Sequence, residues 1–291
     1  MPLSVIVISY NAGRLEQCLE ALLRQPEAAE IIVSDCSVND PAERLAPLFP
    51  TVRFAHFSEK RSVPQLRWAA VRETSGDLIA SLEARSVPAN DWCAVLVRAH
   101  EENPDAPVVG GPIGFPATST ARNWGVYFCE YGQFAPPVET GPVRDLSGAN
   151  ASYKRAALEE ASDLLDAGKW ETDLHHRWRE QGRRAILSSA TVCFENALPI
   201  ATVLRQRVAY GRGYAAARLA DAAWLRRAGY AVCCPLLPLL LTVRLGRSLR
   251  GKGLLPHFWR ALPWIVLFNS AWAGGEMVGY LFGQSSKVEN Y

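Results

Sequence analysis

Three short apolar runs, each followed at once by polar residues, limit the folds that this chain can adopt. They occupy residues 3–9, 30–34 and 78–82 and are rich in valine, isoleucine and leucine. Uninterrupted runs of this length are typical of strands buried on both faces, as in parallel sheets. Segments with helical spacing of apolar residues separate them, and such alternation indicates βαβ units. The sequence therefore predicts an α/β fold in which helices flank a mostly parallel sheet.

Polar residues stand at the carboxyl end of each predicted strand. The first run ends in Ser9, Tyr10 and Asn11, the second in Asp35 and the third in Glu83. The carboxyl ends of parallel strands lie at one edge of the sheet, and open α/β sheets bind their ligands at that edge. We therefore expect these side chains to gather around one ligand.

Six short motifs follow one another between residues 3 and 185. They are LSVIVISYN (3–11), EIIVSDCSVND (30–40), PQLRWAA (64–70), GDLIASLEARSVP (76–88), GANASYKR (148–155) and GKWETDLH (168–175). Their order and spacing resemble those of the family 2 inverting glycosyltransferases, which have the GT-A fold. The resemblance implies that a sugar is transferred from a nucleotide-diphosphate sugar to an acceptor.

The resemblance assigns nucleotide-sugar binding to the sheet edge, to a helix and to a later basic segment: Ser9, Tyr10, Asn11, Asp35, Arg61, Arg67, Glu83, Arg207 and Arg212. Asp35 can accept hydrogen bonds from the base or the ribose, or it can cap a helix. Where the family has a second acid, this chain has Cys36. Arg61 and Arg67 can each donate two parallel N–H bonds to phosphate oxygens, or they can lie on a solvated helix face.

Glu83 stands where the resembled family has two or three acids that hold a divalent cation. Here Glu83 is followed by Ala84 and Arg85. Such cations require several oxygen ligands, to which one carboxylate, the diphosphate and water can contribute. Two alternatives therefore stay open: Glu83 holds Mg²⁺ or Mn²⁺ weakly, or Arg85 replaces the charge of the metal.

Glu171 takes the position of the family's catalytic base, at the start of a predicted helix. A base in an inverting transfer must lie within hydrogen-bond reach of the acceptor hydroxyl. A carboxylate in a first helical turn can also serve only to stabilise the helix dipole. The resemblance places Gly148, Asn150 and Asp173 on the acceptor side of the site.

The charge of the chain changes near residue 199. From residue 200 onward there are 12 Lys and Arg against 3 Asp and Glu, a net charge of +9. The first 199 residues have 19 against 26, a net charge of −7. We therefore expect a GT-A domain over residues 1–198 and a helical, apolar, membrane-associating region over residues 199–291.

Arginines and apolar residues are interleaved over residues 199–229, which predicts one long amphipathic helix on an anionic membrane surface. The uncharged run 231–243 is shorter than the roughly twenty residues of a spanning helix, so we expect it to be re-entrant or interfacial, with kinks at Pro235 and Pro238. The second run, 261–275, extends to residue 282 if Glu276 is tolerated, and it is then long enough to span. The alternative to membrane association is that residues 199–291 form a helical lid packed on the catalytic domain.

The seven cysteines show no metal-ligand spacing and no disulfide framework, which favours a reducing compartment. Residues Met1 and Pro2 lead directly into a predicted strand, so we expect no signal peptide. Five basic residues lie between the two apolar runs and favour a cytoplasmic loop: Arg244, Arg247, Arg250, Lys252 and Arg260. The predicted location is the cytoplasmic face of the cell membrane.

The sequence thus predicts an inverting glycosyltransferase that uses a polysaccharide, glycolipid or lipid-linked acceptor and contacts membrane lipids. It gives no indication of a nucleic-acid partner. The rival interpretation is a catalytically silent nucleotide-sugar-binding or scaffold protein, which Cys36 and Arg85 favour. Nucleotidyl transfer would require a Gly-rich basic loop after the first strand, and Tyr10-Asn-Ala-Gly13 does not supply one.

Overall fold

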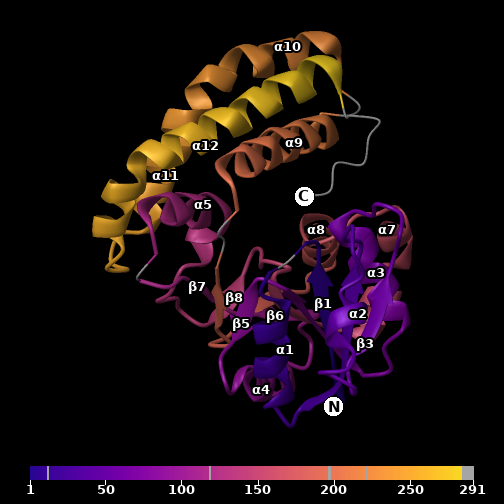
Figure 1. Cartoon of the computed structure of the whole chain (residues 1–291). Coiled ribbons are helices and arrows are strands. Elements are labelled where there is room, and N and C mark those ends of the chain that lie inside the picture. The colour runs from indigo at the N-terminus through magenta and orange to yellow at the C-terminus, as the bar shows by residue number, and fades with distance from the viewer. Residues whose placement is uncertain (12, 118, 196–197, 220–221, 284–291) are drawn as a thin grey trace. The chain divides into compact units, whose positions relative to one another are not determined.

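The structure is a computed structural model that describes residues 1–11, 13–117, 119–195, 198–219 and 222–283. The chain divides into two compact units. We name them the sheet unit, residues 1–114 and 136–194, and the helical unit, residues 115–135 and 195 onward. Figure 1 labels their helices and strands.

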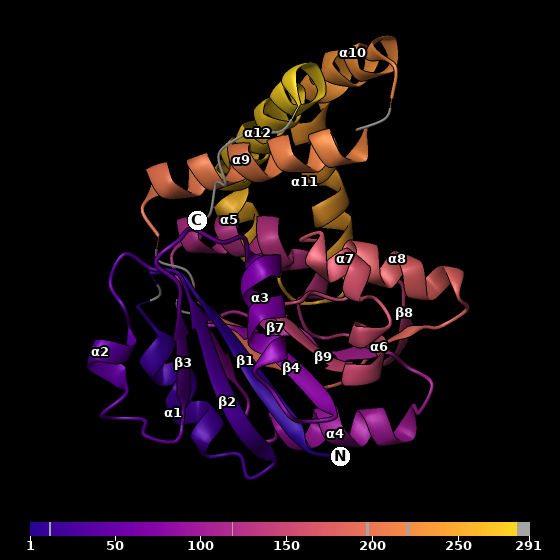
Figure 2. The same cartoon turned by 90° about the vertical axis from the view of Figure 1, so that its right-hand side faces the viewer.

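An eight-stranded sheet forms the centre of the sheet unit, with strand order β3-β2-β1-β4-β9-β6-β10-β8. Its strands are β1 (Leu3–Ser9), β2 (Ala28–Asp35), β3 (Arg53–His56), β4 (Leu78–Glu83), β6 (Val108–Gly110), β8 (Gly141–Val143), β9 (Asn150–Lys154) and β10 (Ala185–Leu187). Figure 2 shows β3, β2, β1 and β4 side by side. Within the described sheet, β9 runs antiparallel to its neighbours β4 and β6, and β8 runs antiparallel to β10. The other neighbouring strands are parallel, so the predicted mostly parallel sheet is confirmed.

A smaller sheet of three strands lies in the same unit, in the order β5-β11-β7. Its strands are β5 (Ser86–Pro88), β7 (Ile113–Gly114) and β11 (Val192–Phe194). Because β5 begins only three residues after β4 ends, the intervening turn of Ala84 and Arg85 is held between two sheets.

The helices of the sheet unit are α1 (Leu15–Leu23), α2 (Ala42–Leu45), α3 (Val63–Arg72), α4 (Trp92–Glu102), α6 (Arg155–Glu159), α7 (Ser162–Asp166) and α8 (Thr172–Glu180). Helix α3 begins with a capping box, in which the Ser62 hydroxyl accepts from the Gln65 N–H and the Gln65 side chain accepts from the Ser62 N–H. Pro64 in the first turn of α3 loses no helical hydrogen bond.

One core lies between the large sheet and helices α3, α6, α7 and α8. Ile6, Ile32 and Ile79 of the sheet pack there with Val71 of α3 and Trp178 of α8. The neighbours of Ile6 along β1 are also buried, as expected for a strand covered on both faces. This packing fixes α3 and α8 on the same face of the sheet.

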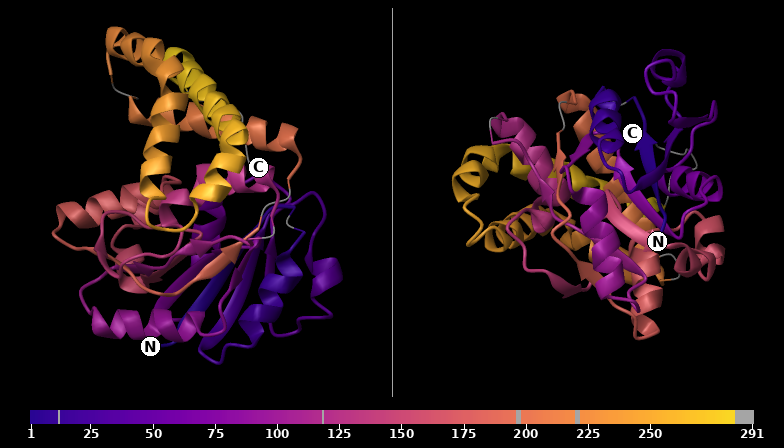
Figure 3. Two further views of the ribbon diagram at one scale, coloured as in Figure 1. Left: turned by 90° about the vertical axis from the view of Figure 1, so that its left-hand side faces the viewer. Right: turned by 90° about the horizontal axis from the view of Figure 1, so that it is seen from below.

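The helical unit contains α5 (Ala121–Tyr131), the one-turn helix η1 (Gly132–Phe134), α9 (Ile200–Arg218), α10 (Trp224–Cys233), the one-turn helix η2 (Cys234–Leu236), α11 (Leu237–Ser248) and α12 (Leu255–Phe282). Helix α12 packs against α9, α5, α11 and α10; in Figure 3 the helices α9 to α12 are orange to yellow and α5 is magenta. A Cβ at Gly275 would meet the Val208 carbonyl, so the glycine permits close packing of α12 on α9.

The contact-based units differ from the expected boundary after residue 198. Residues 115–135 belong to the helical unit because Val126 of α5 packs with Val203 of α9 and Phe268 of α12. A boundary drawn along the sequence cannot place an internal segment in a later unit.

The predicted single helix over residues 199–229 is wrong. It is divided into α9 and α10, and the extended backbone of Ala223 (φ −56°, ψ 147°) precedes α10. The break lets Tyr230 of α10 pack with Leu219 and Tyr280 in one apolar cluster.

Among the described residues, one helical segment is long and apolar enough to cross a membrane, and it is Trp224–Ser248. The sequence had pointed instead to residues 261–282. The apolar run is longer than expected because α10, η2 and α11 follow one another directly, and Pro235 and Pro238 lie in first turns, where proline is tolerated. Helix α12 instead buries Phe258, Ile265 and Phe268.

Candidate active site

The carboxyl ends of three neighbouring strands form one edge of the large sheet. Ser9 of β1 pairs in register with Asp35 of β2, and Asp35 pairs with His56 of β3. On the other side of β1, Ile8 is in register with Glu83 of β4. The backbone thus brings together the strand ends from which the sequence predicted a common site.

Asp35 is buried, with 1% of its surface exposed. One carboxylate oxygen accepts the Ser37 N–H at 2.8 Å and lies 3.0 Å from His56 Nδ1, and the other accepts the Ser37 hydroxyl at 2.6 Å. Asn11 donates its N–H to the same hydroxyl at 2.7 Å, with its backbone at a positive φ of 48°. Asp35 therefore orders the turns after β1 and β2 and does not cap a helix.

Cys36 replaces the expected second acid because its surroundings are apolar. It is buried and packs with Ile8 and Leu66, and Tyr10 lies against the same cluster. An ionised carboxylate in this apolar cluster would be partly desolvated, whereas a thiol is not penalised there. Arg61 stacks over the Phe57 ring at 3.7 Å from its centroid.

Glu171 immediately precedes α8 and has a strained backbone, with φ at 41°. Its side chain is 37% exposed, and its Oε1 accepts a hydrogen bond of 2.6 Å from Arg67 Nη1. Its Oε2 accepts no hydrogen bond from the described residues. One oxygen is thus held by the protein while the other can accept a proton from a ligand.

The structure places Arg67 differently from the expected donor contact. Its side chain is only 2% exposed, lies over the Trp170 ring and bonds Glu171. Burial lowers the pKa of Arg67, but Glu171, Tyr153 and Glu83 outweigh this effect and raise it above its usual value. Arg67 therefore remains charged and is committed to carboxylates of the protein.

Gly148 allows this ion pair to form. A Cβ at Gly148 would lie 2.6 Å from Arg67 Nη1 and would also meet Glu171 Oε1. Trp170, beside the pair, donates its indole N–H to the Tyr153 hydroxyl at 3.2 Å. Gly148 is therefore required for the packing around Glu171, and its predicted role toward the acceptor stays a prediction.

The other two residues predicted on the acceptor side occupy contrasting positions. Asn150 is fully buried in β9, where its amide bonds the Pro112 and Ala190 carbonyls at 2.9 and 2.8 Å and accepts the Trp92 indole N–H at 2.8 Å. These bonds give Asn150 a structural role at the start of the central strand β9. Asp173 is exposed on α8.

Glu83 is not part of a carboxylate cluster that fits a divalent cation. Within the described residues, no three His, Cys, Asp or Glu side chains lie close enough together to hold a metal. The residue two positions beyond Glu83 is the cation Arg85. The donor set at this edge therefore does not match the several oxygen ligands that Mg²⁺ or Mn²⁺ requires.

Arg207 and Arg212 are bound within the helical unit. Arg207 is buried, lies over the Trp272 ring and donates to the Cys129 carbonyl at 3.5 Å. Arg212 donates to the Gly283 carbonyl at 2.9 Å. Their predicted contact with the donor diphosphate stays a prediction.

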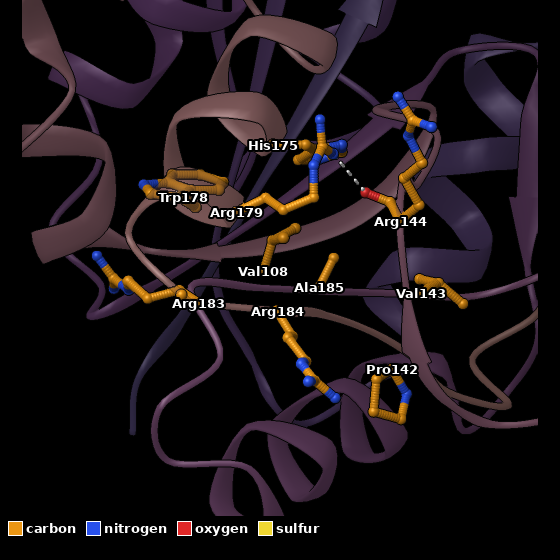
Figure 4. Close-up of a pocket in the computed structure, with 11 residues that line it drawn as sticks. Val108, Pro142, Val143, Arg144, His175, Trp178, Arg179, Arg183, Arg184 and Ala185 are labelled. Atoms are coloured by element: carbon orange, nitrogen blue, oxygen red, sulfur yellow. Dashed lines mark hydrogen bonds between the residues drawn. The ribbon is translucent and has the colours of Figure 1, made fainter.

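A hollow of about 460 Å³ opens beside α8, and four arginines line it (Figure 4): Arg144, Arg179, Arg183 and Arg184. Arg179 donates to the Arg144 carbonyl at 3.5 Å and lies 3.9 Å from Asp145, and Arg183 pairs with Glu160 at 2.7 Å. Because neighbouring carboxylates balance part of this charge, and the predicted site residues do not line the hollow, it is separate from the candidate site.

Four residues of the site were missed from the sequence: Ser37, His56, Tyr153 and Trp170. His56 ends β3, and the carboxyl ends of parallel strands meet at the ligand edge, so the sequence around residues 52–56 held a signal for this residue. Nothing in the sequence placed Tyr153 beside Trp170, because that contact depends on how α8 packs against β9.

A family model described as glycosyl transferase family 2 matches residues 4–161. The match includes Asp35, Arg67 and Glu83 and ends before Glu171. A curated relative, the glucosyl-dolichyl phosphate glucuronosyltransferase of Haloferax volcanii, is 25% identical over 186 residues. That alignment covers 60% of this chain and 57% of the relative, so the chain spans somewhat over half of the protein it matches.

Solved structures resemble the chain at lower identity. A mannosyltransferase of Pyrobaculum calidifontis, in complex with GDP-Man and Mn²⁺, is 19% identical, with a TM-score of 0.53 over 93% of this chain and 86% of that one. GalNAc-T7 with UDP, GalNAc and Mn²⁺ is 14% identical, with a TM-score of 0.56 over 77% of this chain and 51% of that one. These likenesses concern the fold.

Proposed function

The chain belongs to glycosyl transferase family 2, and we propose that it transfers a sugar, with inversion, from a nucleotide-diphosphate sugar to a glycan or lipid-linked acceptor. The fold is the GT-A fold predicted from the sequence, and the protein is a glycosyltransferase. The donor, the stereochemistry, the acceptor and the membrane face are the parts that we propose.

The geometry of Glu171 carries this proposal. Arg67 holds Oε1, which leaves Oε2 at the surface to take the proton of an acceptor hydroxyl. The acceptor oxygen then forms a bond to the anomeric carbon, the bond from that carbon to the diphosphate breaks, and the electron pair leaves with the diphosphate. A single displacement of this kind inverts the configuration at the anomeric carbon.

The edge around Asp35 is the proposed nucleotide site. The Asp35 carboxylate already binds one hydroxyl, that of Ser37, at 2.6 Å. A ribose hydroxyl offers the same donor chemistry, so it could replace Ser37 when the donor binds. GDP-Man and UDP in the two similar structures support a nucleotide-linked donor.

A lipid-linked acceptor is supported by two observations. The Haloferax volcanii relative is named for a dolichyl phosphate substrate. In this chain the potential span Trp224–Ser248 exposes large apolar residues, which are Trp224, Leu225, Val232, Leu236, Leu239, Leu240 and Val243. Arg226, Arg227, Arg244 and Arg247 lie within the same segment and suit an anionic lipid surface. We propose that it contacts the cytoplasmic membrane face.

Transfer is tested with the full chain, a panel of nucleotide sugars and two acceptors, a polyprenyl phosphate and a short glycan. An α-linked donor should give a β-linked product by NMR, and an α-linked product would overturn the inverting mechanism. Donor binding without transfer to either acceptor would instead favour the catalytically silent protein.

Membrane association is tested by flotation of the full chain with vesicles. Leu236→Glu with Leu239→Glu replaces two exposed apolar side chains and should abolish flotation with phosphatidylglycerol-containing vesicles. Point changes are preferable to removal of residues 199–291, because that truncation would uncover the α5 face that packs with Val203 and Phe268. Flotation of the double variant at the wild-type level would contradict the proposed contact.

A further inference from the structure

We propose that Arg85 does the work of a divalent cation in this protein: its guanidinium binds the diphosphate of the donor, and transfer proceeds without a metal. The inference rests on the proposed function, because it requires a nucleotide-diphosphate donor at the sheet edge. It decides between the two alternatives that the sequence left open for the motif Glu83-Ala-Arg85.

The position of Arg85 is fixed by the structure on both sides. β4 ends at Glu83, Ala84 donates its N–H to the Ile8 carbonyl at 2.9 Å, and β5 begins at Ser86. The turn that contains Arg85 is therefore bound to Ile8 near the end of β1. The residue after Ile8 is Ser9, which is in register with Asp35. This is the edge at which a nucleotide would lie.

Arg85 differs from the other arginines of this edge because it has no partner among the residues that the structure describes. It is half-buried, and in the described chain its guanidinium makes no hydrogen bond or ion pair. Arg67 is bound to Glu171, and Arg61 stacks on Phe57. Partial burial of an unpaired cation is unfavourable, so an anionic ligand would stabilise Arg85.

The charge at the edge leads to the same conclusion. Two negative phosphates must be neutralised as the leaving group departs. The described carboxylates do not form a metal-binding cluster, and the field of Glu83 already acts on the buried Arg67. Arg85 is the guanidinium left to donate two parallel N–H bonds to diphosphate oxygens.

The first experiment measures nucleotide binding by calorimetry, using UDP, GDP, ADP, CDP and dTDP with the full chain in either EDTA or Mn²⁺. The nucleotide that binds should have the same Kd in both conditions to within about twofold. Arg85→Ala should weaken that binding by about tenfold or more, since a hydrogen bond to a charged group is lost.

The second experiment restores an acid at the position. Arg85→Asp creates the sequence Glu-Ala-Asp, so nucleotide binding and transfer should be lost in EDTA and recovered when Mn²⁺ is added. Binding of Mn²⁺ itself, followed by electron paramagnetic resonance, should be detectable in Arg85→Asp with the nucleotide and absent from the wild type under the same conditions. This measurement does not depend on activity.

Arg98→Asp is the matched control, because Arg98 is exposed on α4 and the charge change is identical. It should leave binding metal-independent and unchanged. If nucleotide binding or transfer by the wild type disappears in EDTA and returns with Mn²⁺, the inference about Arg85 is overturned and the proposed function stands. The same holds if Arg85→Ala binds the nucleotide in EDTA as tightly as the wild type does. Failure of the wild type to bind any nucleotide in either condition would overturn the proposed function as well.

Discussion

Asp35 and Glu171 are two carboxylates at the candidate site that differ in exposure and in how many of their oxygens have partners in the protein. Asp35 is 1% exposed, and Ser37 and His56 contact both of its oxygens. Glu171 is 37% exposed, and only one of its oxygens is held, by Arg67. The first carboxylate orders the turns around it, whereas the second is fixed at one end and open at the other.

In the proposed function, this difference separates binding of the nucleotide, by Asp35, from proton transfer, by Glu171. A carboxylate that binds a nucleotide can exchange one hydroxyl partner for another without changing its own protonation. A general base must keep one oxygen available and must not move away from the acceptor. Variants that break each arrangement should therefore alter different kinetic constants, and four of them test the comparison.

Glu171→Gln should have the largest effect. The amide keeps the size of the side chain and can accept from Arg67, but it cannot take the acceptor proton. We expect kcat to fall by about 10²–10⁴-fold with donor affinity unchanged. The exposed neighbour Asp173 supplies the control, since Asp173→Asn should transfer sugar almost as the wild type does. Loss of activity in Asp173→Asn but not in Glu171→Gln would show that the base is misassigned by two residues.

Arg67→Met should come next. It removes the hydrogen bond to Oε1 and leaves Glu171 free to rotate, and misplacement of a catalytic group by about 1 Å can cost on the order of 100-fold in rate. Because Arg67 is buried against the protein, the Kd for the donor nucleotide should hardly change. A second variant, Arg67→Ala, leaves space for a guanidinium ion, and guanidinium added to it should restore part of kcat. A rise in donor KM at unchanged kcat would return Arg67 to the phosphate-binding role predicted from the sequence.

Gly148→Ala should have a smaller effect in the same direction. The new Cβ would meet both members of the ion pair, so Arg67 and Glu171 must separate. We expect kcat to fall by about tenfold, together with a loss of about 1–3 kcal/mol in the free energy of unfolding from overpacking. Thermal melting beside steady-state kinetics measures both. Unchanged kcat with lowered stability would mean that the pair does not position the base.

The strand–helix alternation was predictable because each strand of the parallel half is one local run of apolar residues. The strands β1, β2 and β4 follow such runs closely. The antiparallel strand β9 was not predicted, because residues 148–155 contain no long apolar run and their pairing with β4 is non-local. The packing of α5 with α9 and α12 was not predicted for the same reason, since α5 ends at residue 131 whereas α9 and α12 begin at residues 200 and 255.

The identity of the site residues was easier to predict than their partners. Asp35, Glu83 and Glu171 follow from strand ends and motif order. The pairing of Arg67 with Glu171 joins residues 104 positions apart and depends on α3 and α8 covering the same face of the sheet. Burial of Arg67 could not be predicted, because its helical spacing is equally consistent with a solvated face.

Asp35→Asn should have the smallest effect of the four and should change a different constant. The amide can keep the bonds to Ser37 and His56, so the turns stay ordered and only the negative charge is lost. We expect the donor KM to rise by about tenfold, as for a weakened hydrogen bond to a charged group, while kcat is unchanged.

Ser37→Ala sharpens that test. It removes the hydroxyl that occupies the second oxygen of Asp35, at 2.6 Å, and leaves that oxygen open to a ribose hydroxyl. If the donor replaces Ser37 there, Ser37→Ala should bind the donor at least as tightly as the wild type does, because no internal bond has to be broken. Weaker donor binding in Ser37→Ala, together with unchanged binding in Asp35→Asn, would mean that the Ser37 hydroxyl contacts the donor itself and that Asp35 only positions it.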